Sequence, residues 1–527
     1  MRTEILAAIC AAVVAFAAGV PAAATPFRFA NDGDVNSMDP YARNETFLLT
    51  FTGNIYEPLI RRDKQLKVSP SLATEWSQVS PELWRFKLRQ GVKFQDGTPF
   101  TADDVVFSFD RVRMDGSNLK AVVASIKTVT KIDDHTVEMA TDGAAPILPE
   151  EITNWYMMSK VWAEKNNATK PADLTKNEDF YASRNANGTG PFMLKQREPE
   201  VRTILVANPN WWDKPEHNVT EAVFTRIGND STRVAALLSG EIDMMYTVPP
   251  QDIERIRKTS GVKIYEGPEL RTVFLGFDQV RDELLESSVK GKNPFKDVRV
   301  RQAFYQAIDQ EAIKSKVMRG SATVTALMIG PGINGFDKAL NDRYPHDVAA
   351  AKKLLAEAGY PSGFELGMDC PTDRYINDEA ICQAVVAMLA RIGVKVNLLA
   401  QTRGKYFGKI LGPGYNTSFY MLGWTPATYD ARDMLFNIIG SRTVPGGGLF
   451  NVGGYSNKRV DELTRMIQGE TDAAKRMAEI SEAMKIHKEE FGHIPLHQQA
   501  VVWAARDTID LVQLADNFFP LRYVTVK

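Results

Sequence analysis

Three histidines near the C-terminus, His487, His493 and His497, have the spacing that most suggests metal or catalytic chemistry. Imidazole is both a common metal ligand and a general base. However, the apolar residues 494–496 predict entry into a strand, where His493 and His497 would share a face but stand too far apart for one metal ion. We expect ordinary packing of these rings, and a secreted hydrolase that uses them is the most distant alternative.

Other catalytic signatures are absent from the sequence. It contains no G-x-S-x-G, no H-E-x-x-H, no phosphate-binding loop of the G-x-x-x-x-G-K-[ST] type and no C-x-x-C. The carboxylate pairs Asp103–Asp104 and Asp133–Asp134 fit a helix start and a turn better than an acid/base pair. We therefore predict no enzymatic activity, no catalytic residue, no metal ligand and no cofactor.

A lone arginine, Arg374, lies in the polar segment CPTDRYIND at 370–378. One interpretation is a solvated charge that pairs with Asp373 or Asp378. The other is a guanidinium that binds a carboxylate through paired, charge-assisted hydrogen bonds, each contributing about 1.5–3 kcal/mol. The residue type alone leaves both open.

An aromatic residue, Trp424, follows an apolar run in MLGWTPATYD at 421–430. Gly423 precedes it, and Pro426 ends strand pairing soon after. A core tryptophan is the simpler interpretation, because indole rings are usually mostly buried. A wall of a ligand cleft is the alternative.

The elements that would position Arg374 form a βαβ unit. The apolar spacing predicts a helix over 347–358, a strand over 364–369, a second helix over 380–392 and a strand over 394–399. Such a unit has a right-handed crossover and two parallel strands. Arg374 would then lie at the carboxyl edge of the sheet, where ligands collect in open α/β folds.

A second compact unit is expected near residue 100. Residues 83–89, LWRFKLR, alternate apolar and cationic side chains, which predicts a half-buried strand. Asp96–Gly97 predicts a turn, and the segment 101–104 predicts the capped start of a helix.

The cysteines and the N-terminus concern export. Residues 1–24 are typical of a secretory signal peptide, with Arg2 before an apolar run and alanines before a cleavage point. A lipoprotein attached through Cys10 is less favoured, because Ile9 stands where a small residue is needed. Cys370 and Cys382 allow a disulfide, but we expect two unpaired, mostly buried thiols. The mature protein is expected in the periplasm.

Composition excludes several classes of protein. The chain has 527 residues, 44% hydrophobic and 24% charged, which is enough for two or three cores. Lys and Arg total 63 and Asp and Glu 65, so the net charge of -2 provides no field that would attract nucleic acid. After the signal, no apolar stretch approaches the ~20 residues of a membrane span. A monomer without nucleic-acid partners is expected.

Several segments resemble the extracytoplasmic solute-binding proteins of family 5, the dipeptide, oligopeptide and nickel binders of ABC transporters. The resemblance is carried by LATEWSQVSPELWRFKLRQGVKFQDGTPFTADDVVFSFDRV at 72–112, NGTGPFML at 187–194, DVRVRQAFYQAID at 297–309 and DVAAAKKLLAEAGYPSGFEL at 347–366. These segments occur in the family's order and extend along most of the mature chain.

The resemblance implies a two-lobe α/β clamp of the class II-like, cluster C type that closes on a solute and presents it to an inner-membrane ABC permease. Lobe I would comprise 25–55, 180–267 and 491–527, with a small extra domain over 56–179. Lobe II would span 268–490 and carry the loops that grip the ligand.

The resemblance also implies a set of binding residues. Arg374 matches the loop in which dipeptide binders hold the ligand carboxylate, and Trp424 matches a Gly-Trp segment that lines the cleft. The full set of candidates is Arg374, Trp424, Thr425, Asp430, Asn44, Glu45, Thr46 and Trp155. For Asn44, Glu45 and Thr46 a turn is the alternative interpretation, and for Trp155 a core aromatic.

One departure from the family bears on the ligand. Peptide-binding relatives have an aspartate three residues after this tryptophan to pair with the peptide amine, but this chain has Ala427. Asp430 or Glu45 would have to supply that charge, because a buried ammonium without a partner is strongly disfavoured. The expected ligand is a small anionic or zwitterionic solute: peptide-like, a modified amino acid or a peptide conjugate. A metal-complex or haem carrier is the alternative within this fold.

Overall fold

The computed structural model describes residues 26–411, 414–444 and 447–527. The predicted signal peptide and Cys10 therefore lie outside the described residues. Within these ranges no helix combines the length and the apolar character that crossing a membrane requires.

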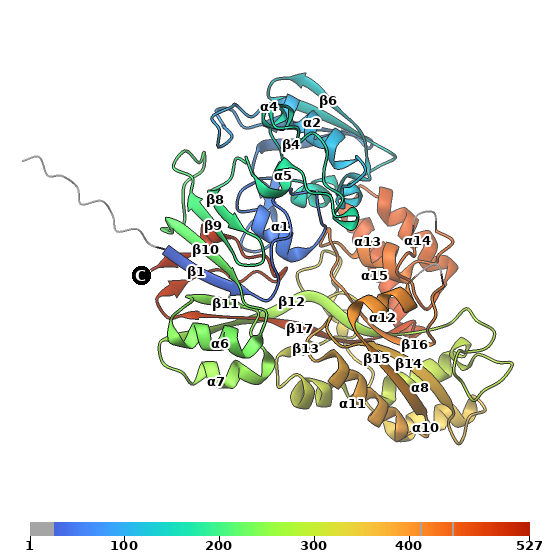
Figure 1. Ribbon diagram of the computed structural model, residues 1–527. Helices are drawn as coiled ribbons and strands as arrows, with labels where there is room; N and C mark the ends of the chain where they lie inside the picture. Colours follow the sequence, from blue (N-terminus) through green and yellow to red (C-terminus); the bar gives the residue numbers. More distant parts are fainter. Residues whose placement is uncertain (1–25, 412–413, 445–446) are drawn as a thin grey trace, which may run out of the picture.

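A large mixed sheet runs through the molecule (Figure 1). Among the described residues it has eleven strands: β1 (Pro26–Asn31), β8 (Phe192–Glu198), β9 (Arg202–Ala207), β10 (Glu221–Arg226), β11 (Met244–Tyr246), β12 (Val262–Phe277), β13 (Ala322–Val324), β14 (Glu365–Pro371), β15 (Lys395–Gln401), β16 (Phe419–Trp424) and β17 (His493–Arg506). The order is β15-β14-β16-β12-β17-β11-β1-β10-β9-β8, with β13 paired to β17.

The long strands β12 and β17 join two lobes. Their antiparallel ladder extends from Val262 opposite Arg506 to Gly276 opposite His493. In Figure 1 they cross the middle of the molecule, with β1 and β8–β11 on one side and β14–β16 on the other. We call these sides lobe I and lobe II. Lobe II has two apolar cores, one on each face of its sheet, and lobe I has separate ones.

Helices cover the sheet and fill the space beyond it. They are α1 (Thr46–Thr52), α2 (Ala102–Val112), α3 (Leu148–Glu151), α4 (Lys160–Lys165), α5 (Tyr181–Arg184), α6 (Asp230–Ser239), α7 (Ile253–Arg257), α8 (Val298–Ala307), α9 (Gln310–Ala312), α10 (Val348–Glu357), α11 (Asp378–Ala390), α12 (Arg403–Ile410), α13 (Ala431–Met434), α14 (Lys458–Gly469) and α15 (Ala473–Glu489).

A smaller antiparallel sheet lies at the far end of lobe I, beside α2 and α4 (Figure 1). Its order is β4 (Ala73–Ser80), β5 (Leu83–Leu88), β7 (Thr136–Thr141) and β6 (Ile126–Asp133). Short two-stranded pairs complete the described strands: β2 (Ile60–Arg62) with β3 (Val68–Pro70), and β18 (Ile509–Asp510) with β19 (Thr525–Val526).

The two units expected from the sequence are confirmed. In β5, Trp84, Phe86 and Leu88 are buried and alternate with exposed cations. Thr101 starts α2, and its N–H donates to the Asp104 carboxylate at 2.9 Å. β14 and β15 are parallel, from Glu365 opposite Lys395 onward, with α11 between them.

Candidate functional site

Arg374 lies in the loop between β14 and α11, where its side chain is only partly exposed. Asp378 shapes this loop, because its Oδ2 accepts from the N–H groups of Arg374 at 2.9 Å and Tyr375 at 3.1 Å. Asp373 instead accepts from the N–H of Arg403. Neither carboxylate accepts a hydrogen bond from the Arg374 guanidinium. Within the part of the chain that the structure describes, this guanidinium has no hydrogen bond or ion pair.

A disulfide closes the base of the same loop. Cys370 at the end of β14 is bonded to Cys382 of α11. The expectation of two free thiols was therefore wrong. It rested on the size of the core, whereas the strand–loop–helix connection brings the two Cα atoms to 6.5 Å, a distance that a disulfide spans. The bridge encloses the segment that carries Arg374.

A second arginine, Arg271 of β12, lies close to Arg374. Both guanidiniums lie near the ring of Tyr375, at 6.0 Å for Arg271 and 5.1 Å for Arg374. Burial lowers the pKa of Arg374, and the positive charges of Arg271 and Arg403 lower it further. Two neighbouring cations repel each other, so this pair favours an anion between or beside them.

Arg271 is fixed by its own contacts. Its Nε donates to Thr425 Oγ1 at 3.2 Å, and its Nη2 lies 3.4 Å from Glu269 Oε1. Glu269 is buried and also accepts from the Gln499 amide at 2.6 Å. This network ties β12, β17 and the loop after β16 together beside Arg374.

Trp424 ends β16 and lies opposite Thr272 of β12. Its ring packs on Phe450 with centroids 4.7 Å apart, and its Nε1 donates to Asp433 Oδ1 at 2.6 Å. The residue is only partly buried, so part of it is exposed to solvent. Burial raises the pKa of Asp433 to about 6, although the bond from Trp424 favours the ionised form.

Asp430 is engaged inside lobe II. Both its oxygens accept from the Arg476 guanidinium, at 2.7 and 2.8 Å, and Asn334 donates to it at 2.7 Å. The carboxylate is fully buried. It therefore has no free oxygen with which to receive a ligand amine.

The candidates of lobe I are placed differently from one another. Asn44 and Glu45 are exposed immediately before α1, and Thr46 is its first residue. Trp155 is fully buried in the lobe I core, where its ring meets Phe109 edge-on. Thus the structure brings Arg374, Trp424 and Thr425 together, leaves Asn44 and Glu45 on the other lobe, and places Trp155 away from any surface.

Sequence reasoning missed Arg271, Glu269 and a row of amides on β17. Gln498 is buried, and neither atom of its amide has a hydrogen-bond partner in the described structure. It lies opposite Thr272, whose hydroxyl also has none. A charged Arg271 within an apolar strand, and two adjacent glutamines within another, were the signals available.

The histidines form no cluster of three. His487 Nε2 and His493 Nδ1 lie 2.9 Å apart, both buried, and burial lowers the pKa of each. The prediction that His493 and His497 share a face was wrong, because a bulge shifts the ladder between Val273 and Phe274. Among the described residues no three His, Cys, Asp or Glu side chains are placed to hold a metal.

Comparison with known proteins decides the family. Residues 67–445 match the model described as "Bacterial extracellular solute-binding proteins, family 5 Middle". The chain belongs to this family. The two-lobe α/β fold expected from the resemblance is thereby confirmed, and the family is one of solute-binding proteins.

Relatives match the chain along nearly its whole length. The glutathione-binding protein GsiB of Escherichia coli K12 is 25% identical over 478 residues, which are 89% of this chain and 88% of that protein. The periplasmic binding protein DppA from Helicobacter pylori, solved with the peptide STSA, is 24% identical with a TM-score of 0.76. It covers 95% of this chain and 98% of its own.

A third similar protein is AgaA from A. tumefaciens R10, solved in complex with agropinic acid. It is 21% identical with a TM-score of 0.74, over 95% of this chain and 99% of its own. These likenesses establish the architecture of the present chain.

Proposed function

We propose that this protein is the periplasmic substrate-binding component of an ABC importer, and that it captures a small anionic or zwitterionic solute between its lobes. The proposal rests on one observation above all. Arg374 has a guanidinium without a partner in the described structure, beside Arg271, at the carboxyl edge of parallel strands in a solute-binding fold.

The Arg374 guanidinium would hold a carboxylate of the solute. A planar, bidentate contact suits arginine, and the anion would also relieve repulsion from Arg271. Trp424 would form an aromatic wall, since a ring that Asp433 and Phe450 already fix loses little entropy on binding. Thr425, whose hydroxyl accepts a hydrogen bond from Arg271, would lie beside the solute.

An amine on the solute would need a different partner from that of peptide binders. Ala427 replaces the expected aspartate, and Asp430 is committed to Arg476. Glu45 of lobe I is exposed and has no hydrogen-bond partner among the described side chains, so it is our candidate, with Asn44 and Thr46 beside it. The relatives named above bind glutathione, a peptide and agropinic acid, which supports a solute with a carboxylate.

The remaining features follow from the same proposal. Residues 1–24 would direct export and be removed, and the closed protein would deliver its solute to an inner-membrane permease. Lobe I would comprise 25–55, 180–267 and 491–527, the extra domain 56–179, and lobe II 268–490. The apolar cores support a division between the lobes near residue 270. However, one core joins lobe I to the extra domain, and Phe491, Ile494 and Leu496 pack in a core of lobe II.

Native mass spectrometry of freshly isolated protein tests the proposal. We expect a bound small molecule with at least one carboxylate, lost in R374A and retained in R465A, whose arginine is exposed on α14. With the identified solute, calorimetry should give a loss for R374A of about 2 kcal/mol, roughly thirtyfold in Kd.

Two results would contradict the proposal. If R374A binds the identified solute as tightly as the wild type, Arg374 is not the anchor. A solute without any anionic group would refute the proposed ligand class.

A further inference from the structure

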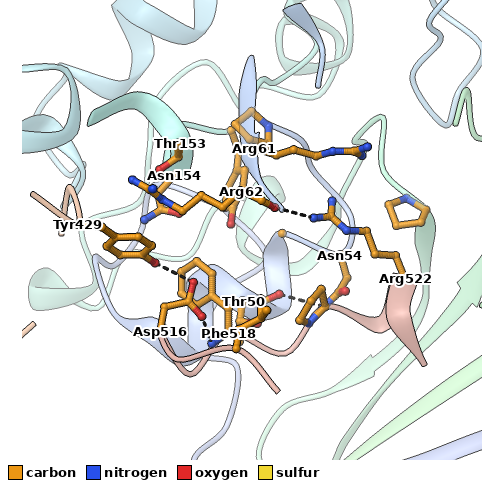
Figure 2. A pocket seen from close by; sticks show the side chains of 16 residues that line it. Thr50, Asn54, Arg61, Arg62, Thr153, Asn154, Tyr429, Asp516, Phe518 and Arg522 are labelled. Atoms are coloured by element: carbon orange, nitrogen blue, oxygen red, sulfur yellow. Dashed lines mark hydrogen bonds between the residues drawn. The ribbon is translucent and has the colours of Figure 1, made fainter. Parts of the chain in front are cut away.

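A cavity that is partly open to solvent lies at the junction of both lobes and the extra domain (Figure 2). Its walls come from the end of α1, from β2, from residues 514–522 and from Tyr429 of lobe II. None of the lining residues belongs to the Arg374 loop. The lining also contains none of Arg271, Trp424, Thr425 and Glu45, so the cavity shares no residue with the candidate solute site, although Tyr429 lies in the same segment as Trp424.

Three guanidiniums line this cavity, those of Arg61, Arg62 and Arg522. Arg61 forms an ion pair with Asp213 at 2.7 Å. Arg62 and Arg522 form none among the described residues. Their hydrogen bonds go to backbone carbonyls: Arg62 donates to Thr428 at 2.9 Å, and Arg522 donates to Arg62 at 3.2 Å.

One carboxylate, Asp516, stands among the described lining residues, and it is already bonded. It accepts from the Tyr429 hydroxyl at 2.7 Å and from the N–H of Phe518 at 2.9 Å. Figure 2 shows Asp516 beside Tyr429 and Phe518, with Arg62 across the cavity and Arg522 on another side. Positive charge thus exceeds negative charge in the wall.

Each arginine also has a buried N–H group without an acceptor. These groups are Nε of Arg62, Nε of Arg522 and Nη1 of Arg61. A buried donor left unsatisfied costs about 1–3 kcal/mol, and more when it is charged. Three such donors around one cavity are unusual, because buried polar groups in native proteins nearly always have partners.

The surroundings hold Arg62 in place before any ligand arrives. Its guanidinium lies 3.8 Å from the centre of the Tyr429 ring, and Leu66 and Thr428 fix its terminal nitrogens at 2.9 Å each. Burial lowers its pKa, although the charges of Glu150, Asp516 and Asp430 act in the opposite direction. A fixed, desolvated cation recognises an oxyanion at little entropic cost.

We propose that this cavity is a second ligand site, which binds a small oxyanion such as sulfate, phosphate or a short carboxylate through Arg62, Arg522 and Arg61. The anion would accept from guanidinium N–H groups of these arginines and balance the excess positive charge. Because Thr428 and Tyr429 belong to lobe II and Arg62 to the extra domain beside lobe I, an occupied site would stabilise this contact between the lobes.

Equilibrium dialysis with radioactive sulfate tests the proposal. The measurement uses the R271Q/R374A protein, so that the candidate solute site does not contribute. We expect one sulfate per chain, at least tenfold weaker binding in the additional R62Q/R522Q variant, and no change in the additional R465Q variant. Competition by phosphate and by malonate then separates inorganic from organic oxyanions.

Sulfate binding that is unchanged by R62Q/R522Q, or no sulfate binding in the parent protein, would overturn the proposal. If R62Q/R522Q fails to fold, a crystal of the wild type soaked in selenate decides the question. An anomalous selenium peak within hydrogen-bonding distance of Arg62 and Arg522 supports the site, and its absence at full soaking concentration refutes it. Neither result depends on the solute site at Arg374.

Discussion

The Arg476–Asp430 pair and the Arg374–Arg271 pair lie in the same lobe, but only the first is neutralised within the chain. Arg476 and Asp430 have side chains that are 7% and 0% exposed and share two hydrogen bonds. Arg374 has no acceptor in the described structure and a like charge beside it. A charged residue whose hydrogen bonds are complete contributes to the fold, whereas one that lacks partners at a sheet edge is available to a ligand.

Breaking the neutralised pair should have the largest effect on stability. R476A leaves the Asp430 carboxylate buried without its counter-charge, which costs about 3–5 kcal/mol. Urea denaturation at pH 7 measures this loss, with R465A as the control that should change stability by less than about 0.5 kcal/mol. The remaining folded protein should bind solute normally, because Asp430 lies outside the proposed contacts. A loss below about 1 kcal/mol would show that the pair is dispensable.

Asp433 is intermediate between a residue that serves only the fold and one that binds ligand, because it is buried yet accepts a hydrogen bond from the Trp424 indole. Its pKa of about 6 in the folded protein exceeds the usual 3.8. Between these two pH values the folded state binds more protons than the unfolded state, so this group's contribution to stability falls as the pH rises. D433N cannot ionise. Its stability relative to the wild type should therefore increase by about 2–3 kcal/mol from pH 4 to pH 7.5.

Parallel urea titrations of D433N and wild type across this range measure the effect, since groups common to both cancel in the difference. A difference that does not vary with pH would mean that Asp433 ionises like an exposed carboxyl.

The disulfide is a further difference between the Arg374 region and the Arg476–Asp430 region, because it supports only the loop of Arg374. C370S/C382S removes a bridge between residues 12 apart, which should cost about 2 kcal/mol of stability. It should also weaken solute binding several-fold, because Arg374 must then be ordered on binding. Calorimetry and denaturation of the variant measure both. Unchanged affinity would show that Asp378 alone orders the loop.

Local patterns in the sequence predicted the local elements well. The alternation at 83–89 and the helical spacing at 380–392 each depend on neighbours within a few residues, and both appear in β5 and α11. Trp424 was also expected at the end of a strand, and it is the last residue of β16. The predictions of unpaired cysteines and of two histidines on one face were wrong. The disulfide depends on how the strand and the helix pack, and the faces of the histidines depend on a bulge; no local pattern encodes either.

The site could be predicted only in part for the same reason. Arg374 was found because its loop lies within one βαβ unit. Arg271, Glu269 and Gln499 come together through the pairing of β12 with β17, more than 200 residues apart in sequence. Periodicity within a strand says nothing of its partner. The three arginines of the cavity likewise come from β2 and from the segment before β19.

Substitution of Arg271 tests the comparison between the two pairs with the smallest expected effect, because Arg271 shares features of both. It has partners in Thr425 and Glu269, as Arg476 has in Asp430, yet it faces Arg374. R271Q keeps a donor for those partners and removes the charge. We expect affinity for the solute to fall by about 1 kcal/mol, roughly fivefold in Kd, with stability changed by less than that. Calorimetry with the identified solute measures this loss. Tighter binding in R271Q would mean that repulsion between the two arginines persists in the complex, and that Arg374 alone meets the anion.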